Sequence, residues 1–328
     1  MTASIYRRVV VVGGAGFIGS HLVRTLLERD GVEAVVVYDN FSSGRRWHLD
    51  RVADDDRLEV VEGEVHALDR LAASVAGATA IVHLASNPDI ARAMTDPTID
   101  FDQGTALTHC VVEAARRQAV DLVLYASGSG VYGDLAEVEA REDHGPLEPV
   151  STYGASKLAG EALLSSYCHM FGLRGRAFRF GNVVGPNQTH GVGFDFVRKL
   201  LADPSRLQIL GDGRQSKSYV HVDDVIAALL LVGEQPDPPY AVYNVATGDY
   251  ITVAEIAALA IECVELDPGE VHLEYQGGDR GWKGDVPVVR IATQQIRALG
   301  WQPRWGSREA LRQSILSMLD DARAGRLW

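Results

Sequence analysis

Cysteine is scarce in this sequence of 328 residues, which contains only Cys110, Cys168 and Cys263. An odd number of widely spaced thiols fits neither a disulfide framework nor the close spacing of zinc ligands. We therefore expect buried thiols in a reducing compartment, and no metal site.

Positive charge is also in short supply, because 31 Lys and Arg residues stand against 44 Asp and Glu residues, for a net charge of -13. Nucleic acid and anionic membranes both favour a basic protein surface. Neither is expected as a partner, although the balance is compatible with a local basic pocket for a phosphorylated metabolite.

Long apolar runs are missing as well, and no stretch has the length needed to span a bilayer. The opening MTASIYRRVVVVGG passes from two arginines directly into an expected strand and turn, which is unlike a signal peptide. These features predict a cytoplasmic protein.

Short β-branched runs alternate with longer amphipathic segments through the first half of the chain, as is typical of βαβ units and a parallel sheet. The expected strands are Arg8–Val12, Ala34–Tyr38, Leu58–Val61, Ala80–Leu84, Leu122–Ser127 and Gly175–Phe180. The expected helices between them are Phe17–Arg29, Leu68–Val75, Thr105–Gln118 and Tyr153–Phe171.

The alternation weakens after Asn182, where shorter helical patterns follow. They cover Phe194–Leu201, Asp223–Val232, Val253–Val264 and Arg308–Ala322. We expect a nucleotide-binding domain over residues 1–182, with some later segments returning to it. Residues 183–328 then form, in the main, a smaller α/β substrate-binding lobe.

The stretch VVVVGGAGFIGSHL reads as a strand, a glycine turn and a helix start, with Gly13, Gly16 and Gly19 spaced by three. Glycines there allow a tight turn and a close approach of the backbone to a pyrophosphate at the helix N-terminus. Asp39 ends the next strand, where an acid can accept hydrogen bonds from the adenosine ribose. The pattern favours NAD over NADP, although Arg45 and Arg46 keep NADP open, and Asp39 as a mere turn residue is the alternative.

The stretch STYGASKLAGEALL places Tyr153 and Lys157 four residues apart, on one face of a helix. A tyrosine titrates near pH 10 and needs a neighbouring cation to act as a base in neutral solution. Lys157 and the positive nicotinamide ring can both stabilise the phenolate. With the dinucleotide loop, this pair predicts proton transfer coupled to hydride transfer.

Seven motifs in order, GGAGFIGSHL, YDNFSSGR, VHLAS, SGSGVYGD, YGASK, RFGNVVGP and KSYVHVDDV, extend over nearly the whole chain. This set resembles the extended short-chain dehydrogenase/reductase family, most closely its UDP-galactose 4-epimerase branch. The resemblance implies an α/β fold: a Rossmann-type doubly wound parallel sheet that binds NAD, with a smaller C-terminal UDP-sugar lobe. It also implies a homodimer formed by two long helices per subunit, here Thr105–Gln118 and Tyr153–Phe171.

The same resemblance implies which residues contact NAD. Besides Gly13, Gly16, Gly19 and Asp39, with Tyr153 and Lys157 beside the nicotinamide, the expected contacts are Phe17, Ile18, Asn40, Ser42, Ser43, Gly44, Glu64, Val65, Leu84, Ala85 and Ser86.

The residues just before VYG bear on the reaction. Nucleotide-sugar 4,6-dehydratases of this superfamily resemble each other in an Asp-Glu pair there, and UDP-glucuronate decarboxylases have a Glu, whereas this chain has Ser129 and Gly130. Because there is no carboxylic acid to act beyond C4, we predict epimerisation at C4 through a 4-keto intermediate. A decarboxylase, dehydratase or dehydrogenase of the same family is the alternative, and a non-catalytic NAD-binding regulator is a third.

The resemblance also predicts a serine that hydrogen-bonds the 4-oxygen, and that position is Gly128 here. Our hypothesis is that Ser129, or secondarily Ser127, takes over this role. The alternatives are that backbone donors of the turn suffice, or that both hydroxyls only satisfy the strand end.

For the UDP-sugar, the resemblance implies contacts from Asn182, Thr189, Lys217 and Arg280, with Ser127, Ser129 and Tyr153 at the sugar. Lys217 stands where the family has an arginine, so it supplies charge to the diphosphate without the bidentate fork. Both cations could instead be solvated surface charges. UDP-glucose, UDP-glucuronate and their N-acetyl relatives all stay open as substrates.

Overall fold

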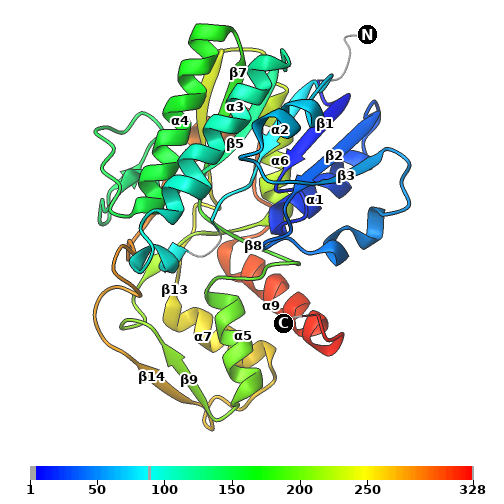
Figure 1. Ribbon diagram of the computed structural model, residues 1–328. Coiled ribbons are helices and arrows are strands. Elements are labelled where there is room, and N and C mark those ends of the chain that lie inside the picture. The colour runs from blue at the N-terminus through cyan, green and yellow to red at the C-terminus, as the bar shows by residue number, and fades with distance from the viewer. Residues whose placement is uncertain (1–4, 88–89, 327–328) are drawn as a thin grey trace. The chain divides into compact units, whose positions relative to one another are not determined.

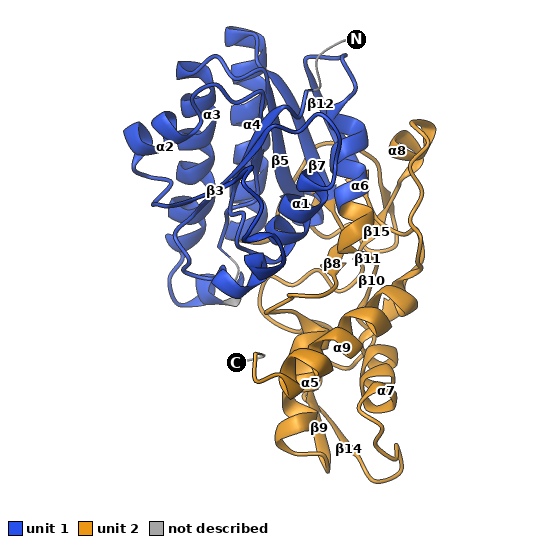
Figure 2. Ribbon diagram, turned by 90° about the vertical axis from the view of Figure 1, so that its right-hand side faces the viewer, with its two compact units in different colours: residues 1–131, 152–179, 226–243 blue, residues 132–151, 180–225, 244–328 orange. Residues whose placement is uncertain are grey.

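The computed structural model describes residues 5–87 and 90–326 and divides into two compact units (Figure 2). Unit 1 comprises residues 1–131, 152–179 and 226–243, and unit 2 comprises residues 132–151, 180–225 and 244–328. Residues 226–243 thus return to the first unit, whereas residues 132–151 lie in the second although the sequence analysis placed them in the first. Which ligand each unit binds stays a prediction.

A seven-stranded sheet forms the centre of unit 1, with the strand order β12-β7-β5-β4-β1-β2-β3 (Figure 1). Its strands are β1 (Arg8–Val12), β2 (Ala34–Asp39), β3 (Leu58–Glu62), β4 (Ala80–His83), β5 (Leu122–Gly128), β7 (Arg174–Phe180) and β12 (Tyr240–Val245). The pairs β1–β2, β2–β3, β1–β4 and β4–β5 are parallel. The expected parallel sheet is confirmed, and its order is that of a Rossmann fold.

Valine-rich runs form the middle of this sheet because both of its faces are covered. In β1, Val9 to Val12 are fully buried, and Val10 pairs in register with Val36 of β2 and Ile81 of β4. Six strands lie where the β-branched runs predicted them. Each of their ends agrees with the prediction to within one residue. The seventh, β12, was missed because its segment follows a proline-rich turn.

Helices cover both faces of the sheet, as Figure 2 shows. They are α1 (Phe17–Leu27), α2 (Leu68–Ser74), α3 (Leu107–Arg117), α4 (Thr152–Phe171) and α6 (Val222–Gly233), the last of which belongs to unit 1 from Ile226 on. Leu71 of α2, Val111 of α3 and Leu164 of α4 share one buried cluster with Val10 and Val123 of the sheet. These three helices therefore pack on one face, and α1 and α6 cover the other.

Short helical turns connect these elements. They are η1 (Arg46–Val52), η2 (Ile90–Met94), η3 (Phe101–Ala106) and η4 (Ser129–Tyr132). The turn η3 is a π-helix that leads into α3, whereas the sequence predicted an α-helix from Thr105. That boundary was wrong, since residue patterns do not distinguish a π-helical turn from the start of an α-helix.

Within its described residues, unit 2 combines four helices, three of which pack together, with small two-stranded pairings. The helices are α5 (Val192–Ala202), α7 (Val253–Cys263), α8 (Gln294–Ala298) and α9 (Ser307–Arg323). The strand pairs are β6 (Glu139–Ala140) with β15 (Arg290–Ile291), β8 (Asn182–Val184) with β11 (Tyr219–His221), β9 (Arg206–Ile209) with β14 (His272–Tyr275), and β10 (Ser216–Lys217) with β13 (Ile251–Thr252). Helices α5, α7 and α9 share one core, which includes Phe196, Ile256 and Leu311.

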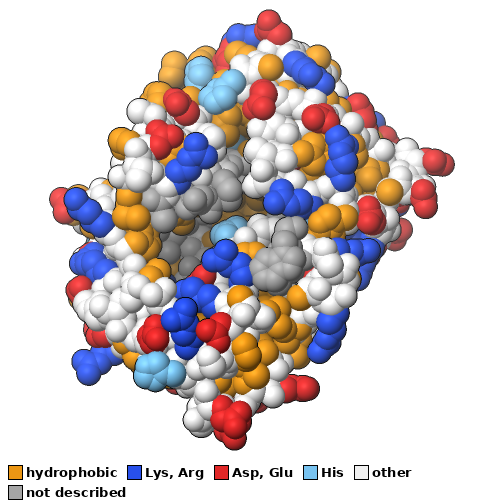
Figure 3. Space-filling model, turned by 60° about the horizontal axis from the view of Figure 1, so that its bottom comes forward, with side chains coloured by type: hydrophobic (Ala, Val, Ile, Leu, Met, Phe, Trp, Pro, Cys, Tyr) orange, Lys and Arg blue, Asp and Glu red, His pale blue; other side chains and the backbone are white. Residues whose placement is uncertain are grey.

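Outside the cores, acidic and basic side chains are interspersed on the face shown in Figure 3. Many form ion pairs, such as Arg116 with Glu113 and Arg312 with Glu262. The three cysteines are free thiols; Cys168 and Cys263 are buried, and Cys110 is half-buried. Within the described residues, no helix is both long and apolar enough to cross a membrane, and no cluster of metal-ligating side chains occurs.

One buried ion pair ties α4 to β7 and gives a stability prediction. Arg179 and Glu161 pair at 2.7 Å with side chains 4% and 5% exposed. Removing one partner leaves the other charge buried and unpaired, so Glu161→Ala should cost about 3–5 kcal/mol in the free energy of unfolding, measured by urea denaturation. The exposed pair Arg7–Glu33 supplies the control, because Glu33→Ala should cost under about 1 kcal/mol. Equal losses in both variants would contradict the assignment.

Candidate active site

The glycine loop between β1 and α1 is built for close backbone approach. Gly13 has φ +84°, and a Cβ there would come within 2.7 Å of the Ala85 nitrogen. A Cβ on Gly19 would collide with the carbonyl oxygen of Gly13, whereas one on Gly16 would meet only that oxygen, at 3.2 Å. The loop therefore presses against the end of β4, and its Gly16 leaves room for a ligand at the start of α1.

Helix α1 begins directly after this loop, at Phe17, and its N-cap Gly16 offers no side-chain hydrogen bond. The first backbone N–H groups of the helix, which include those of Phe17 and Ile18, thus have no capping side chain. An arrangement of this kind suits an anion such as a pyrophosphate.

Asp39, at the end of β2, is buried against the glycine loop. Its Oδ2 accepts a hydrogen bond from the Ala15 N–H at 2.9 Å, and its Oδ1 accepts one from the Phe41 N–H at 2.8 Å. Burial raises the pKa of Asp39, and the backbone N–H groups of Phe41 and Ala15 oppose this rise. The carboxylate is therefore fixed where the loop and the second strand meet.

Several of the other predicted dinucleotide contacts of unit 1 lie beside these two features. Asn40 donates to Glu64 at 3.0 Å and accepts from both the N–H and the hydroxyl of Ser42. A Cβ on Gly44 would approach Asp39 Oδ1 to 3.0 Å. Leu84 and Ala85 both donate backbone N–H groups to the Val12 carbonyl, and the rest of the set is Ser43, Val65 and Ser86.

The two arginines that kept NADP open are engaged within the protein. Arg46 pairs with Glu62 and lies over the Phe41 ring at 4.3 Å. Arg45 donates to the carbonyl oxygens of Ser43 and Gly44 at 3.1 and 3.3 Å. Because neither is held free beside Asp39, whose charge repels a 2′-phosphate, the geometry suits NAD.

Tyr153 and Lys157 lie one turn apart on α4, and the Lys157 Nζ is 5.4 Å from the centre of the Tyr153 ring. Lys157 is 4% exposed and donates to the Ala126 carbonyl of β5 at 2.8 Å. Burial lowers the pKa of Lys157 to about 8, and the charge of Asp100 opposes this fall.

The phenol of Tyr153 is harder to ionise than a free tyrosine. Burial, and then the charge of Asp100, raise the pKa of Tyr153 to about 12, while Ser86 lowers it. Lys157 alone therefore does not lower the pKa of Tyr153 to neutral pH. A role as base requires further positive charge beside the ring.

The two candidate serines of the β5 end have different surroundings. Ser127 is buried and donates its hydroxyl to Glu161 at 2.5 Å, within the Glu161–Arg179 pair. Ser129 begins the turn η4 and is half-buried, and among the described residues its hydroxyl has no hydrogen-bond partner in the protein. The prediction of a sugar contact therefore rests on Ser129 more than on Ser127.

Gly128 lies between these serines and leaves open space. A Cβ built there would have no neighbour within 4 Å, and one on Gly130 would meet only the Gly154 Cα, at 3.5 Å. Neither glycine is required by its backbone, since neither has a positive φ. Gly128, the position where the family has a serine, therefore has open space around it in this unit.

In unit 2, the two predicted diphosphate cations lie close together and are both engaged with Asp285. Lys217 pairs with the Asp285 carboxylate at 2.5 Å, while Arg280 donates to the Asp285 carbonyl at 2.7 Å and pairs with Asp134 at 2.6 Å. The Lys217 side chain is 23% exposed and the Arg280 side chain 37% exposed, so both are ion-paired and partly open to solvent. The acidic partners were not predicted, because they lie 68 and 146 positions away in the sequence.

The remaining predicted substrate contacts of unit 2 are on β8 and the loop after it. Asn182 starts β8 and is exposed, with its amide 3.5 Å from the Ser218 carbonyl. Thr189 is half-buried in the loop before α5. Their roles stay predictions.

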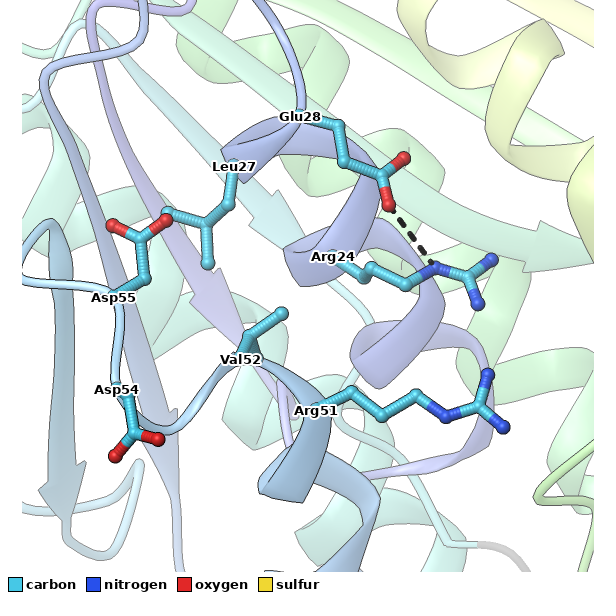
Figure 4. Close-up of a pocket in the computed structure, with 7 residues that line it drawn as sticks. All are labelled: Arg24, Leu27, Glu28, Arg51, Val52, Asp54 and Asp55. Carbon is cyan, nitrogen blue, oxygen red and sulfur yellow. Dashed lines mark ion pairs between the residues drawn. The ribbon is translucent and has the colours of Figure 1, made fainter.

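A separate surface pocket of unit 1, with a volume of about 450 Å³, lies at the C-terminal end of α1 (Figure 4). Figure 4 shows Arg24 and Arg51 extending in the same direction from α1 and η1, with Asp54 and Asp55 on the other side of Leu27 and Val52. Arg24 is partnered by Glu28. Because the glycine loop is at the opposite end of α1, this pocket is distinct from the predicted dinucleotide site at the glycine loop and Asp39.

Comparison with known proteins decides the family. The model of the NAD dependent epimerase/dehydratase family matches residues 9–246, which is most of the chain. The chain belongs to this NAD-dependent epimerase/dehydratase family. Its match includes the glycine loop, Asp39, Tyr153 and Lys157.

Several members are similar over nearly the full length. The UDP-glucose 4-epimerase of Mycolicibacterium smegmatis is 33% identical, over 94% of this chain and 97% of the relative. A UDP-galactose 4-epimerase structure is 36% identical with a TM-score of 0.83, covering 98% of this chain and all of that one. The dTDP-glucose 4,6-dehydratase DesIV of Streptomyces venezuelae, solved with NAD bound, is 28% identical with a TM-score of 0.88, covering 97% and 98%.

The cofactor of this family, NAD, fits the residues present. The loop is closed to any side chain at Gly13 and Gly19 and open at Gly16, the helix start lacks a cap, and Asp39 is fixed beside the loop. The pyrophosphate would lie at Gly16, Phe17 and Ile18 and the adenosine ribose at Asp39.

Sequence reasoning missed the polar residues that surround the start of α4. Asp100 is 1% exposed and accepts hydrogen bonds from Asn87 and from Thr152, the residue directly before Tyr153. The sequence carries little signal for it, because TIDFDQGT has no spacing that relates Asp100 to a residue 53 positions later. Only the fold brings them together.

Gly16→Ala should weaken NAD binding while the fold persists. The added methyl meets only the Gly13 oxygen, at 3.2 Å, so it intrudes chiefly on the space for the pyrophosphate. We expect the Kd for NAD, measured by calorimetric titration of NAD-stripped protein, to rise at least ~10-fold. Gly193→Ala in helix α5, whose added methyl makes only ordinary contacts with Ile315 and Leu311 at 3.7 and 3.8 Å, is the control and should leave the Kd unchanged. An unaltered Kd in Gly16→Ala would refute this placement of the cofactor.

Proposed function

We propose that this protein is a UDP-sugar 4-epimerase that inverts C4 through a transient 4-keto intermediate and keeps its NAD tightly bound. The observation that carries the proposal is the Tyr153–Lys157 pair on α4 beside a β5 end that offers Ser129 and Gly130 but no acid. The candidate substrates are UDP-glucose with UDP-galactose, and UDP-glucuronate with UDP-galacturonate.

Tyr153, Lys157 and Ser129 have different roles at the sugar 4-oxygen in this proposal. Tyr153, as phenolate, accepts the proton of the 4-hydroxyl, and Lys157 stabilises the phenolate by its charge. Ser129 donates a hydrogen bond to the same oxygen in the ketone state. Bound NAD supplies the hydride acceptor and donor for C4. A phenol with a pKa of about 12 requires more positive charge than Lys157 supplies, and the ring of bound NAD would provide it.

Dehydration and decarboxylation are the alternatives within the family, and both need chemistry beyond C4. Two buried carboxylates lie in this part of unit 1, and both are already engaged: Glu161 in its pair with Arg179, and Asp100 with Asn87 and Thr152. Neither carboxylate is thus suited as a general acid, which favours epimerisation.

A nucleotide diphosphate is favoured by the cation pair of unit 2. Lys217 and Arg280 both contact Asp285, so their side chains lie near one another. Two adjacent cations match the two charges of a diphosphate. Thr189 and Asn182 of the same unit are neutral donors, so they suit a hydroxymethyl group and also tolerate a carboxylate at C6.

A homodimer is part of the same proposal. The C-terminal end of α4 exposes Met170 and Phe171, at 72% and 48% of their surfaces, and Phe101 before α3 is 61% exposed. Phe101 lies beside the first turn of α4, and Met170 and Phe171 lie at its other end, so the support consists of exposed apolar side chains at both ends of one helix rather than of one continuous patch.

The direct test is incubation of the purified protein, without added NAD, with a panel of UDP-sugars and chromatography of the products. We expect a gluco/galacto mixture from at least one member, since enzyme-bound NAD is regenerated in each turnover. Tyr153→Phe should convert none. Absence of conversion for every panel member would defeat the proposal, and NADH released in proportion to the product would favour a dehydrogenase instead.

The role of Ser129 is tested by removing its hydroxyl and by supplying a hydroxyl at position 128 instead. Ser129→Ala should lower kcat by roughly 10-fold to 100-fold, the order expected for losing one oxyanion donor or less. Gly128→Ser adds a serine in open space at the position the family uses. In the Ser129→Ala background it should restore part of the lost kcat. Full turnover of Ser129→Ala alone would remove Ser129 from the mechanism.

A further inference from the structure

Asp100 is a buried carboxylate that the proposed mechanism does not use. It precedes the π-helix η3 and is 1% exposed. Burying a carboxylate is costly unless donors satisfy it, so its surroundings decide what it does.

Two donors from different segments converge on this carboxylate. Asn87, which follows β4, donates its amide to Oδ1 at 3.0 Å. Thr152, the first residue of α4, donates its hydroxyl to Oδ2 at 2.7 Å. Asp100 therefore joins the β4 end and its own π-helix to the turn that carries Tyr153.

The π-helix also packs tightly on that turn. A Cβ on Gly104 of η3 would come within 2.5 Å of the Ser156 hydroxyl, and this hydroxyl donates to the Tyr153 carbonyl at 2.8 Å. Since only a glycine permits this approach, η3 and the first turn of α4 form one rigid contact. A shift of Asp100 would be transmitted directly to Tyr153.

The charge of Asp100 reaches both members of the pair. It raises the pKa of Tyr153 and that of Lys157, while burial acts upward on the first and downward on the second. The other titratable groups that face the pair differ in kind. His83 on β4 has a pKa lowered to about 3 and is neutral, Tyr125 on β5 has a raised pKa, and Glu161 on α4 is paired with Arg179.

We propose that Asp100 is a positioning residue for this site, which anchors the Tyr153 turn through Thr152 and keeps the buried Lys157 ammonium charged. The inference rests on the proposed role of Tyr153 and Lys157 in proton transfer. It adds a counter-charge that acts through these two residues.

The sign of the effect follows from the charges. Lys157, with a pKa of about 8, is charged below that pH and loses its charge as pH rises through it. Asp100→Asn removes the negative charge but keeps groups that can bond to Asn87 and Thr152. The Lys157 pKa should therefore fall, and the alkaline limb of the pH profile of kcat should move to lower pH.

The midpoint of Lys157 can be measured without turnover, because the chain has four lysines: Lys157, Lys199, Lys217 and Lys283. With 13C-labelled lysine in the NAD-bound protein, the Cε shift of each is followed by NMR against pH, and Lys157→Met assigns the signal. We expect Asp100→Asn to lower the Lys157 midpoint by roughly half a unit to one unit. An unchanged midpoint would overturn the electrostatic part, whether or not the protein proves to be an epimerase.

Thr152 separates anchoring from charge. Thr152→Val removes the hydrogen bond to Asp100 and leaves the carboxylate in place, so kcat should fall by roughly 10-fold with KM and the Lys157 midpoint unchanged. Thr152→Ser retains the hydroxyl and should restore kcat. Should Asp100→Asn fail to fold, this pair still decides the anchoring, because a wild-type kcat in Thr152→Val would contradict it.

Discussion

The hydrogen bond from the buried Lys157 ammonium to the Ala126 carbonyl is the constraint on which the site depends. No carboxylate among the described residues forms an ion pair with this ammonium, so the fold must supply other stabilisation. The carbonyl at the end of β5, the ring of Tyr125 at 5.4 Å and the charge of Asp100 provide it. Helix α4 can lie this close to β5 because Gly160 has no side chain to meet the Tyr125 hydroxyl.

The proposed reaction depends both on the absence of an acidic side chain at the β5 end and on the positions of the acids Glu161 and Asp100. Both glycines of SGSG leave open space at the β5 end, and no acid occupies it. Glu161 is used inside the unit, where it orders Ser127 and Arg179, and Asp100 is used to order Thr152. A site with one base, one cation and neutral donors can remove and return a proton at one oxygen. At Ser129 and Gly130, within the described residues, there is no carboxylic acid to serve as the second proton donor that elimination beyond C4 requires.

Much of this was predictable, for identifiable reasons. Buried parallel strands must be apolar and β-branched, so β1 to β5 and β7 stood out, and close backbone approach requires glycine at Gly13 and Gly19. Tyr153 and Lys157 were found because their interaction is local, within one helical turn. The rest depends on contacts between distant residues. Asp285 beside Lys217, Glu161 beside Ser127 and Asp100 beside Thr152 are separated by 68, 34 and 52 positions, and no residue pattern records such neighbours. Strand β12 was missed because it directly follows a proline-rich turn, and the π-helix η3 because its sequence resembles that of an α-helix.

The central claim is that hydrogen leaves C4 of the sugar and returns to C4. The most direct measurement uses the UDP-sugar that the protein converts, carrying deuterium at C4, with the purified protein and no added NAD, and locates the label in the product by NMR. The account predicts an inverted C4 that retains the deuterium. Deuterium found at C6 together with loss of water, or deuterium released to solvent, would contradict it.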